Sequence, residues 1–227
     1  MLCPTLLSHR PDRLRSLIQH CCMFHLVDHP IIRERLTQIR SVDSEAPAFR
    51  HALHDVAQMM CFSVTADLET KSIEVETPLT KTQGYGLARR VVLVPILRAG
   101  VGMMNGFIEI LTEASVGYIG LYRDEKTLQP HAYYCKLPEH TAESDVILID
   151  PMLATGGSAA DAADELKKAG ANRIRFVCLI AAPEGVAAFE ARHPDIPIYS
   201  AALDEKLNEN AYIFPGLGDA GDRYFGT

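Results

Sequence analysis

The stretch ILIDPMLATGGSAADAADELKKAG, residues Ile147–Gly170, passes from an apolar run through one carboxylate and a glycine-rich turn into a helical pattern. The run VILID predicts a buried strand that ends at Asp150, and SAADAADELKKAG predicts a helix. Neither the carboxylate nor the small-residue turn contributes to a core. Because ligands of open α/β folds bind at the carboxyl ends of the strands, this turn is a candidate ligand site.

The same alternation continues through the centre of the chain. From Arg90 onward, short β-branched runs alternate with helical stretches. The expected strands are VVLVPIL, SVGYIGLYR, DVILID, RIRFVCLIAA and IPIYSAAL, and the expected helices are VGMMNGFIEILTE, SAADAADELKKAG and GVAAFEARH. Continuous apolar strands separated by helices indicate an α/β fold with a mainly parallel central sheet flanked by helices on both faces.

The two ends of the chain differ from this centre. His29-Pro30 followed by IIRERLTQIR predicts a helix entered through proline, and Ala46–Met60 predicts a second one, so that the two form an N-terminal layer. We expect residues 1–22 to be a disordered extension, with Met23 as an alternative start. Asp204–Thr227 has two glycine-rich turns and no helical period, which predicts a loop or hairpin flap.

Composition excludes several classes of protein. The net charge of -7 argues against non-specific binding of nucleic acid, which requires clustered Lys and Arg. The longest apolar runs are far too short to span a membrane. Six cysteines without CxxC spacing give no support for a metal site and indicate reduced thiols, hence a cytoplasmic protein.

The turn after Asp150 has the chemistry of an anion site. Asp150 can reach a sugar hydroxyl, and the segment Ala154–Ser158 combines small residues, two hydroxyls and backbone N–H groups with the positive end of the next helix. The alternative is a purely structural strand-to-helix turn in which Ser158 is the N-cap of that helix.

Two common phosphate motifs do not fit this turn. A nucleoside triphosphate loop needs a lysine before its Ser or Thr, and here Gly157 occupies that position. No GxGxxG follows a strand with an acidic partner further on, which argues against a dinucleotide. A monophosphate seat beside a diol-binding carboxylate remains, and this combination predicts a phosphorylated ribose.

Two further strand ends carry an arginine. In VPILRAGVGM, Arg98 follows a buried strand, and the glycines after it allow a ligand to approach the backbone closely. Such an arginine suits multiply charged oxyanions, or it pairs with a surface carboxylate. In LYRDE, Arg123 has the same two interpretations, with Asp124 and Glu125 as its neighbouring carboxylates.

Several separated motifs, taken together, resemble one family. VPILRAGVGM, IGLYRDE, YYCKLP, DPMLATGGSA, AAPEG and NENAYIFPGLGDAGDRYFGT resemble the uracil phosphoribosyltransferase family in the same order, over nearly all of residues 24–227. The resemblance implies the type I phosphoribosyltransferase fold, with one domain over residues 23–227 that includes a small C-terminal hood at about 203–227. It also implies transfer of phosphoribose from 5-phosphoribosyl 1-diphosphate (PRPP) to uracil, giving uridine monophosphate (UMP) and pyrophosphate.

The resemblance also implies partners and roles for individual residues. The PRPP-binding residues would be Arg98, Arg123, Asp150, Pro151, Met152, Leu153, Ala154, Thr155, Gly156, Gly157, Ser158 and Asp219, and the uracil-binding residues Ile213, Gly218, Asp219 and Ala220. Arg98 and Arg123 would act electrostatically on the pyrophosphate side, with no protein-held metal and Mg²⁺ carried by PRPP. A homodimer or higher homo-oligomer is implied, and some members are activated by GTP.

Two positions in the hood and two rival functions stay open. Ala211 departs from the family pattern, where glycine is common, and Tyr212 packs either against the base or in the wall of the site. A transferase for another base would differ in its hood sequence. A regulatory relative that binds RNA would need a basic face with exposed aromatic residues, and this acidic chain has no Trp.

Overall fold

A computed structural model describes residues 23–123 and 130–227 of the chain, with the backbone alone at 122, 123 and 130–132. The extension predicted over residues 1–22 therefore lies outside the described residues. The core of the fold is a nine-stranded sheet. Its strands, in spatial order, are β1 (Phe24–Leu26), β11 (Ile198–Leu203), β10 (Ile174–Ala181), β8 (Asp145–Ile149), β4 (Val91–Leu97), β6 (Tyr118–Arg123) and β7 (Pro130–Lys136). The short strands β5 (Ser115–Val116) and β9 (Met152–Leu153) pair with β4 and β10.

The sheet is mainly parallel, as predicted. All its strand pairs are parallel except that between β6 and β7, which is antiparallel. Parallel strands place their carboxyl ends along a common edge, so the residues that follow β4, β8 and β10 lie near one another. The site is built at this edge.

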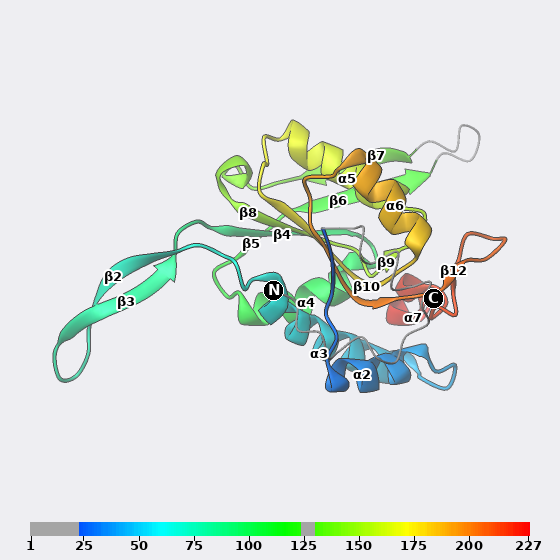
Figure 1. Ribbon diagram of the computed structural model, residues 1–227, viewed down its shortest axis with the longest axis horizontal. Helices are drawn as coiled ribbons and strands as arrows, with labels where there is room; N and C mark the ends of the chain where they lie inside the picture. Colours follow the sequence, from blue (N-terminus) through cyan, green and yellow to red (C-terminus); the bar gives the residue numbers. More distant parts are fainter. Residues whose placement is uncertain (1–22, 124–129) are drawn as a thin grey trace.

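Helices cover both faces of the sheet (Figure 1). On one face lie α2 (Pro30–Arg40), α3 (Ala46–Val64) and α4 (Gly100–Ile110), and on the other lie α5 (Gly157–Lys168) and α6 (Pro183–Arg192). Alternate residues of β8 enter the two cores: Ile147 packs on the side of α3, and Leu148 packs on the side of α5. Burial on both faces explains why these strands are apolar throughout.

The N-terminal layer is confirmed. α2 begins at Pro30, and the His29 ring accepts a hydrogen bond from the N–H of Ile31 at 3.2 Å. α3 runs past the predicted end at Met60 to Val64, and its buried residues recur at helical spacing. Among the described residues, no helix has both the length and the apolar content needed to cross a bilayer.

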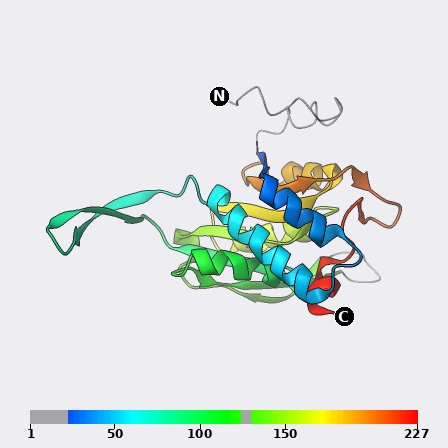
Figure 2. The same cartoon turned by 90° about the horizontal axis from the view of Figure 1, so that it is seen from below.

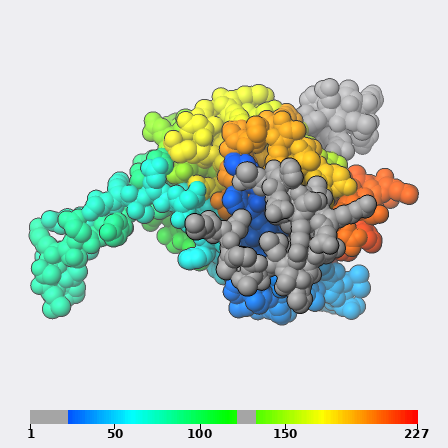
Figure 3. Space-filling model, in the orientation of Figure 1, coloured from blue at the N-terminus to red at the C-terminus, as the bar shows by residue number. Residues whose placement is uncertain are grey.

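A two-stranded arm, which the sequence analysis did not predict, projects from the body of the molecule (Figures 1 and 3). β2 (Thr70–Glu76) and β3 (Lys81–Leu87) pair with each other and with no other strand of the described residues. All residues of β2 are exposed, so neither face of the hairpin forms a core within the chain. Ile73 and Val75 alternate with polar residues in β2, so the short run SIEVE carries a strand signal that the sequence analysis did not use.

The C-terminal segment differs in part from its prediction. β12 (Lys206–Leu207) and β13 (Ile213–Phe214) form the expected hairpin, but residues Ala220–Phe225 form a short helix, α7, where no helix was expected. The Asp219 side chain caps its start by accepting from the N–H of Asp222 at 2.9 Å, and Gly226 ends it with φ of 76°. Six residues are too few to produce a helical period.

Candidate active site

A cavity of about 700 Å³ opens at the carboxyl edge of the sheet. It lies between the turn that joins β9 to α5 and the C-terminal hairpin with α7. Its lining residues are Ala99, Asp150, Met152, Leu153, Ala154, Thr155, Gly156, Ser158, Ala159, Asn210, Ala211, Tyr212, Ile213, Gly218, Asp219, Ala220 and Gly221. Segments about 60 residues apart in the chain thus share one cavity.

Asp150 lies directly after β8, in the wall of this cavity. Its backbone N–H donates to the carbonyl of Val177 at 3.1 Å, and its carboxylate accepts from the N–H of Met152 at 3.4 Å. Burial, and secondarily the charge of Asp219, raises the pKa of Asp150 to about 7. A carboxyl group held in this way exchanges its proton near neutral pH and is ready to accept hydrogen bonds from a ligand.

The turn that follows presents backbone donors to the cavity. α5 begins at Gly157, so Ser158 is inside the helix, and the N-cap is Gly156 with φ of 80°. No side chain of the described residues caps this helix. The structural alternative, with Ser158 as the N-cap, is therefore excluded. Because the first N–H groups of a helix have no partner within it, the start of α5 can bind an anion.

The turn rests on the first residues of α6, with no free space between the two backbones. A Cβ on Gly156 would lie 2.7 Å from the carbonyl oxygen of Gly185, and a Cβ on Gly185 would lie 2.3 Å from that of Ala154. The N–H of Ala182 also donates to the carbonyl of Leu153 at 2.9 Å. The motif AAPEG, residues 181–185, thus forms the floor of the turn.

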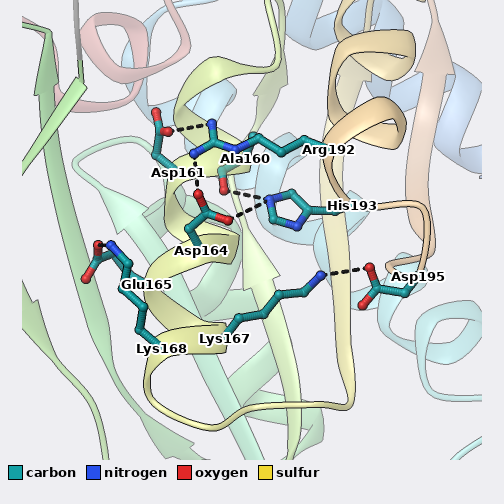
Figure 4. Close-up of polar contacts among 9 residues, drawn as sticks. All are labelled: Ala160, Asp161, Asp164, Glu165, Lys167, Lys168, Arg192, His193 and Asp195. Carbon is teal, nitrogen blue, oxygen red and sulfur yellow. Dashed lines mark hydrogen bonds and ion pairs between the residues drawn. The ribbon is translucent and has the colours of Figure 1, made fainter.

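Side chains from the end of α6 hold α5 in place (Figure 4). Arg192 donates to Asp161 at 2.6 Å and also to Asp164. The buried ring of His193 contacts the carbonyl oxygen of Ala160 through Nε2 at 2.9 Å. These contacts fix the orientation of the helix whose first turn lines the cavity.

The opposite wall is the C-terminal hood. Its hairpin is closed by Asn208, whose side-chain oxygen accepts from the N–H groups of Asn210 at 3.0 Å and Tyr212 at 2.9 Å. Ala211 has φ of 62°, in the left-handed region that disfavours residues with a Cβ. Tyr212 lines the cavity with half of its surface exposed, whereas Ile213 is buried.

Neither of the two predicted arginines has a side chain that the structure places in the cavity lining. Arg98 does not line the cavity: its guanidinium lies 3.3 Å from the carboxylate of Asp222 in α7 and over the Phe225 ring. Both partners of the ion pair are more than half exposed, so the pair is weak and open to competition from a ligand. Arg123 ends β6, and its side chain lies outside the described part of the chain.

The cavity brings together most of the residues predicted from the sequence. Those in its lining are Asp150, Met152, Leu153, Ala154, Thr155, Gly156, Ser158, Ile213, Gly218, Asp219 and Ala220. Pro151 and Gly157 are not in the lining; the Pro151 carbonyl instead accepts from the N–H groups of Leu179 and Ile180. Ala99, Ala159, Asn210 and Gly221 were not predicted, and they carry no chemical signal beyond their place beside predicted residues.

The acidic groups of the lining are Asp150 and Asp219. Within residues 23–123 and 130–227, no group of three or more His, Cys, Asp or Glu side chains could hold a metal ion. Two carboxylates suit a hydrated divalent cation that also binds the phosphates of a ligand.

Comparisons with known proteins agree with this architecture. The family model described as uracil phosphoribosyltransferase matches residues 26–227. The chain is 54% identical over 205 residues to the uracil phosphoribosyltransferase of Malacoplasma penetrans, with 90% of this chain and 100% of the relative covered. It is 52% identical over 205 residues to that of Enterococcus faecalis, with 90% and 98% covered.

Solved structures extend the comparison to the fold. A protein of Aquifex aeolicus superposes with a TM-score of 0.85 at 35% identity, and the match covers 90% of this chain and 99% of that one. The adenine phosphoribosyl transferase of Trypanosoma brucei superposes with a TM-score of 0.56 at 11% identity, over 86% of this chain and 88% of that one. The second match shows a shared fold alone.

We expect Asp150→Asn to change how stability depends on pH. The pKa of Asp150 is raised in the folded protein, so its contribution to stability is fully present below about pH 4 and is lost as the pH rises through about 7. Asparagine keeps the contact with Met152 without the charge. The variant should therefore gain thermal stability relative to the wild type as the pH rises, as measured by calorimetry.

The control for this experiment is Asp195→Asn. The hydrogen bond from Lys167 lowers the pKa of Asp195, so this carboxylate stabilises the fold above its ordinary pKa, and the variant should lose stability relative to the wild type as the pH rises. A difference between Asp150→Asn and the wild type that stays constant with pH would contradict the burial of Asp150.

We expect Ala211→Gly to stabilise the hood. Glycine adopts positive φ without steric cost, so the substitution should raise the free energy of unfolding by up to about 1 kcal/mol. Ala187→Gly, at an exposed position inside α6, is the control and should lower it by about 1 kcal/mol. Chemical denaturation measures both; equal losses in the two variants would show that Ala211 is not strained.

Proposed function

The chain belongs to the uracil phosphoribosyltransferase family, and we propose that the cavity at the carboxyl edge of its sheet binds the two substrates of that reaction. The enzyme transfers the 5-phosphoribosyl group of PRPP to uracil and gives UMP and pyrophosphate. One observation carries the assignment of the site: Asp150, the uncapped start of α5 and the C-terminal hood line a single cavity.

PRPP occupies the side of the cavity formed by the turn. The uncapped N–H groups and hydroxyls of residues 154–158 bind its 5-phosphate, supported by the positive end of the α5 dipole. Asp150 accepts hydrogen bonds from the ribose hydroxyls. Asp219 lines the same cavity, and its charge acts on Asp150, so Asp219 also contacts PRPP.

Uracil occupies the hood side, against Ile213, Gly218, Asp219 and Ala220. Its two carbonyl oxygens and two ring N–H groups are matched by main-chain groups at fixed spacing. Cytosine has an amino group where uracil has an oxygen, and this would leave a buried donor without a partner, at a cost of roughly 1–3 kcal/mol. Tyr212 closes the wall beside the base.

The reaction needs positioning and charge stabilisation rather than a nucleophilic side chain. As the bond between C1 and the diphosphate breaks, positive charge develops on the ribose and negative charge on the departing pyrophosphate. Arg98 and Arg123, at the ends of β4 and β6, stabilise that negative charge. Arg98 leaves its exposed pair with Asp222 to do so, and the hood holds N1 of uracil over the anomeric carbon.

Magnesium fits this cavity as an ion that arrives with the substrate. Asp150 and Asp219 are carboxylates within the lining, and the described residues offer no cluster of three ligands for a resident ion. Mg²⁺ keeps several waters and prefers substrate phosphates to an all-protein cage. When bound, it neutralises charge on the diphosphate, and Asp150 and Asp219 are the residues that would contact its hydration shell.

GTP is the activator that we propose, and a second cavity supports it. This cavity, of about 770 Å³, lies at the base of the arm and is lined by Lys71, Arg89 and Arg90 among others. Arg89 pairs with Glu69 and Asp145, whereas within the described part of the chain no ion pair engages Lys71 or Arg90. Two unpaired cations beside a cavity suit a polyphosphate.

The cellular setting that we propose is the cytoplasm. Cys61, Cys135 and Cys178 are free thiols, as in proteins of reducing compartments. The negative net charge agrees with small-molecule substrates and argues against nucleic acid as a partner.

A homo-oligomer is supported by the arm. An isolated two-stranded hairpin is marginally stable in water, and this one exposes Ile73, Tyr85 and Leu87 without a core of its own. In Figure 3 it stands away from the body of the chain. A second copy of the chain, packed symmetrically against both arms, would cover these side chains.

The assay that tests the function uses purified protein, Mg²⁺, PRPP and a panel of bases, with detection of nucleotide and pyrophosphate. UMP from uracil is the expected product. Arg123→Ala should lower kcat about 100-fold while the preference for uracil over cytosine persists. Lys136→Ala, which removes an exposed cation at the other end of the β6–β7 pair, should leave kcat unchanged. An unchanged kcat in Arg123→Ala would refute its role.

Sedimentation velocity over a range of concentrations tests the oligomer. We expect the wild type to sediment as a dimer or larger, and the double variant Ile73→Asp/Tyr85→Asp to dissociate at higher concentration, because it places charges in an apolar interface. Val42→Asp, on the exposed turn between α2 and α3, should not affect assembly. A monomeric wild type, or a double variant that assembles like the wild type, contradicts this role of the arm.

A further inference from the structure

The loop between the hood hairpin and α7 is tied to the N-terminal helices by a partly buried ion pair. Arg40, the last residue of α2, donates to both carboxylate oxygens of Asp204, at 2.8 and 2.5 Å. Asp204 follows β11, and only 4% of its side chain is exposed. A two-point contact of this kind fixes the plane of both side chains as well as the distance between them.

The pair also engages both main-chain groups of Gly216. Arg40 Nη1 donates to the carbonyl oxygen of Gly216 at 2.7 Å, and the N–H of Gly216 donates to Asp204 Oδ2 at 2.9 Å. Gly216 has φ of 66°, and a Cβ there would lie 2.1 Å from the carbonyl oxygen of Ile213. The ion pair therefore holds a main-chain position that only glycine can occupy.

A second arginine holds the next residue from the same corner of the fold. Arg223 of α7 donates to the carbonyl of Leu217 at 2.8 Å and to that of Ser41 at 2.6 Å, and its guanidinium lies over the Phe49 ring. Figure 2 shows α7 beside the junction of α2 and α3. The loop is thus held at consecutive residues by contacts that all lead to this junction.

From these contacts we infer that Arg40 is a positioning residue for the uracil side of the site. Gly218 and Asp219 follow Gly216 by two and three residues and line the cavity, and Ile213 precedes it by three. The hydrogen-bond partners of the Arg40 side chain among the described residues are Asp204 and Gly216, neither of which lines the cavity, so Arg40 acts through them. The inference deepens the proposed function and rests on its assignment of the hood to uracil.

The two halves of the cavity are held by different elements. Loss of the Arg40 contacts should therefore affect the binding of the two substrates differently. The turn that receives PRPP is held by α6 on the other face of the sheet, with no contribution from Arg40. A displaced loop at Gly216 therefore weakens uracil binding, whereas PRPP loses at most its contact with Asp219 and keeps the turn that binds its phosphate. A role in folding alone would affect both substrates equally.

The experiment compares KM for uracil, KM for PRPP and thermal stability in Arg40→Met, Arg40→Lys and the wild type. Displacement of the loop by a fraction of an ångström in Arg40→Met should raise KM for uracil about tenfold or more, and KM for PRPP, which loses only the Asp219 contact, by a clearly smaller factor. Arg40→Lys keeps the charge but cannot make the bidentate contact, so its KM for uracil should lie between those of the wild type and Arg40→Met.

Arg35→Met is the matched control. Arg35 is also on α2, and it pairs with Asp55 of α3 at 2.7 Å, with 27% of its side chain exposed against 26% for Arg40. Arg35→Met should lose thermal stability and keep both KM values. If Arg40→Met does not fold, Asp204→Asn is the second test, because it removes one of the shared carboxylate oxygens and should raise KM for uracil selectively.

The possible results of this experiment test the role of Arg40 and the proposed function separately. If the wild type is active but the Arg40 and Asp204 variants keep their KM for uracil, or raise both KM values alike, the role of Arg40 is wrong. The proposed function is then unaffected. A wild type that forms no UMP removes the proposed function as well. A selective rise in KM for uracil, with partial recovery in Arg40→Lys, supports the inference.

Discussion

The uncapped first turn of α5 is the feature on which the site depends. A helix start leaves N–H groups without intrahelical partners, and here no side chain of the described residues caps them. The parallel sheet brings this turn to the same edge as Asp150, and the C-terminal segment folds back over that edge. The cavity therefore combines unused donors with a carboxylate whose burial raises its pKa, which is the chemistry required for a phosphorylated sugar.

Much of the fold and half of the site could be predicted because their signals are local in the chain. The strands of the central sheet are buried on both faces and are therefore apolar throughout, as in VVLVPIL. Residues 150–158 are contiguous, so their composition alone indicates an anion site. The arm was not predicted, because its alternating run SIEVE is short and neither of its faces is buried within the chain, and α7 is too short to show a period.

The other half of the site depends on contacts between distant residues. Arg40 and Asp204 are 164 positions apart, and nothing in the sequence near either residue indicates the other. Arg223 and Ser41 are likewise far apart in the chain, and the sequence near one residue does not indicate the other. In the fold these contacts join the first helical layer to the last segment of the chain, while α6 and β10 hold the turn between β9 and α5. Each half of the cavity thus takes its position from a different face of the sheet.

The contact between Gly156 and Gly185 bears on how such a protein can evolve. Because the two backbones touch without room for a methyl group, neither position tolerates drift on its own, and a compensating change would have to move a whole helix. The hood, by contrast, is a loop fastened by side chains, which single substitutions can alter. On the proposed assignment of the site, new preferences for a base would therefore arise on the hood, while the turn that binds the sugar phosphate would change little.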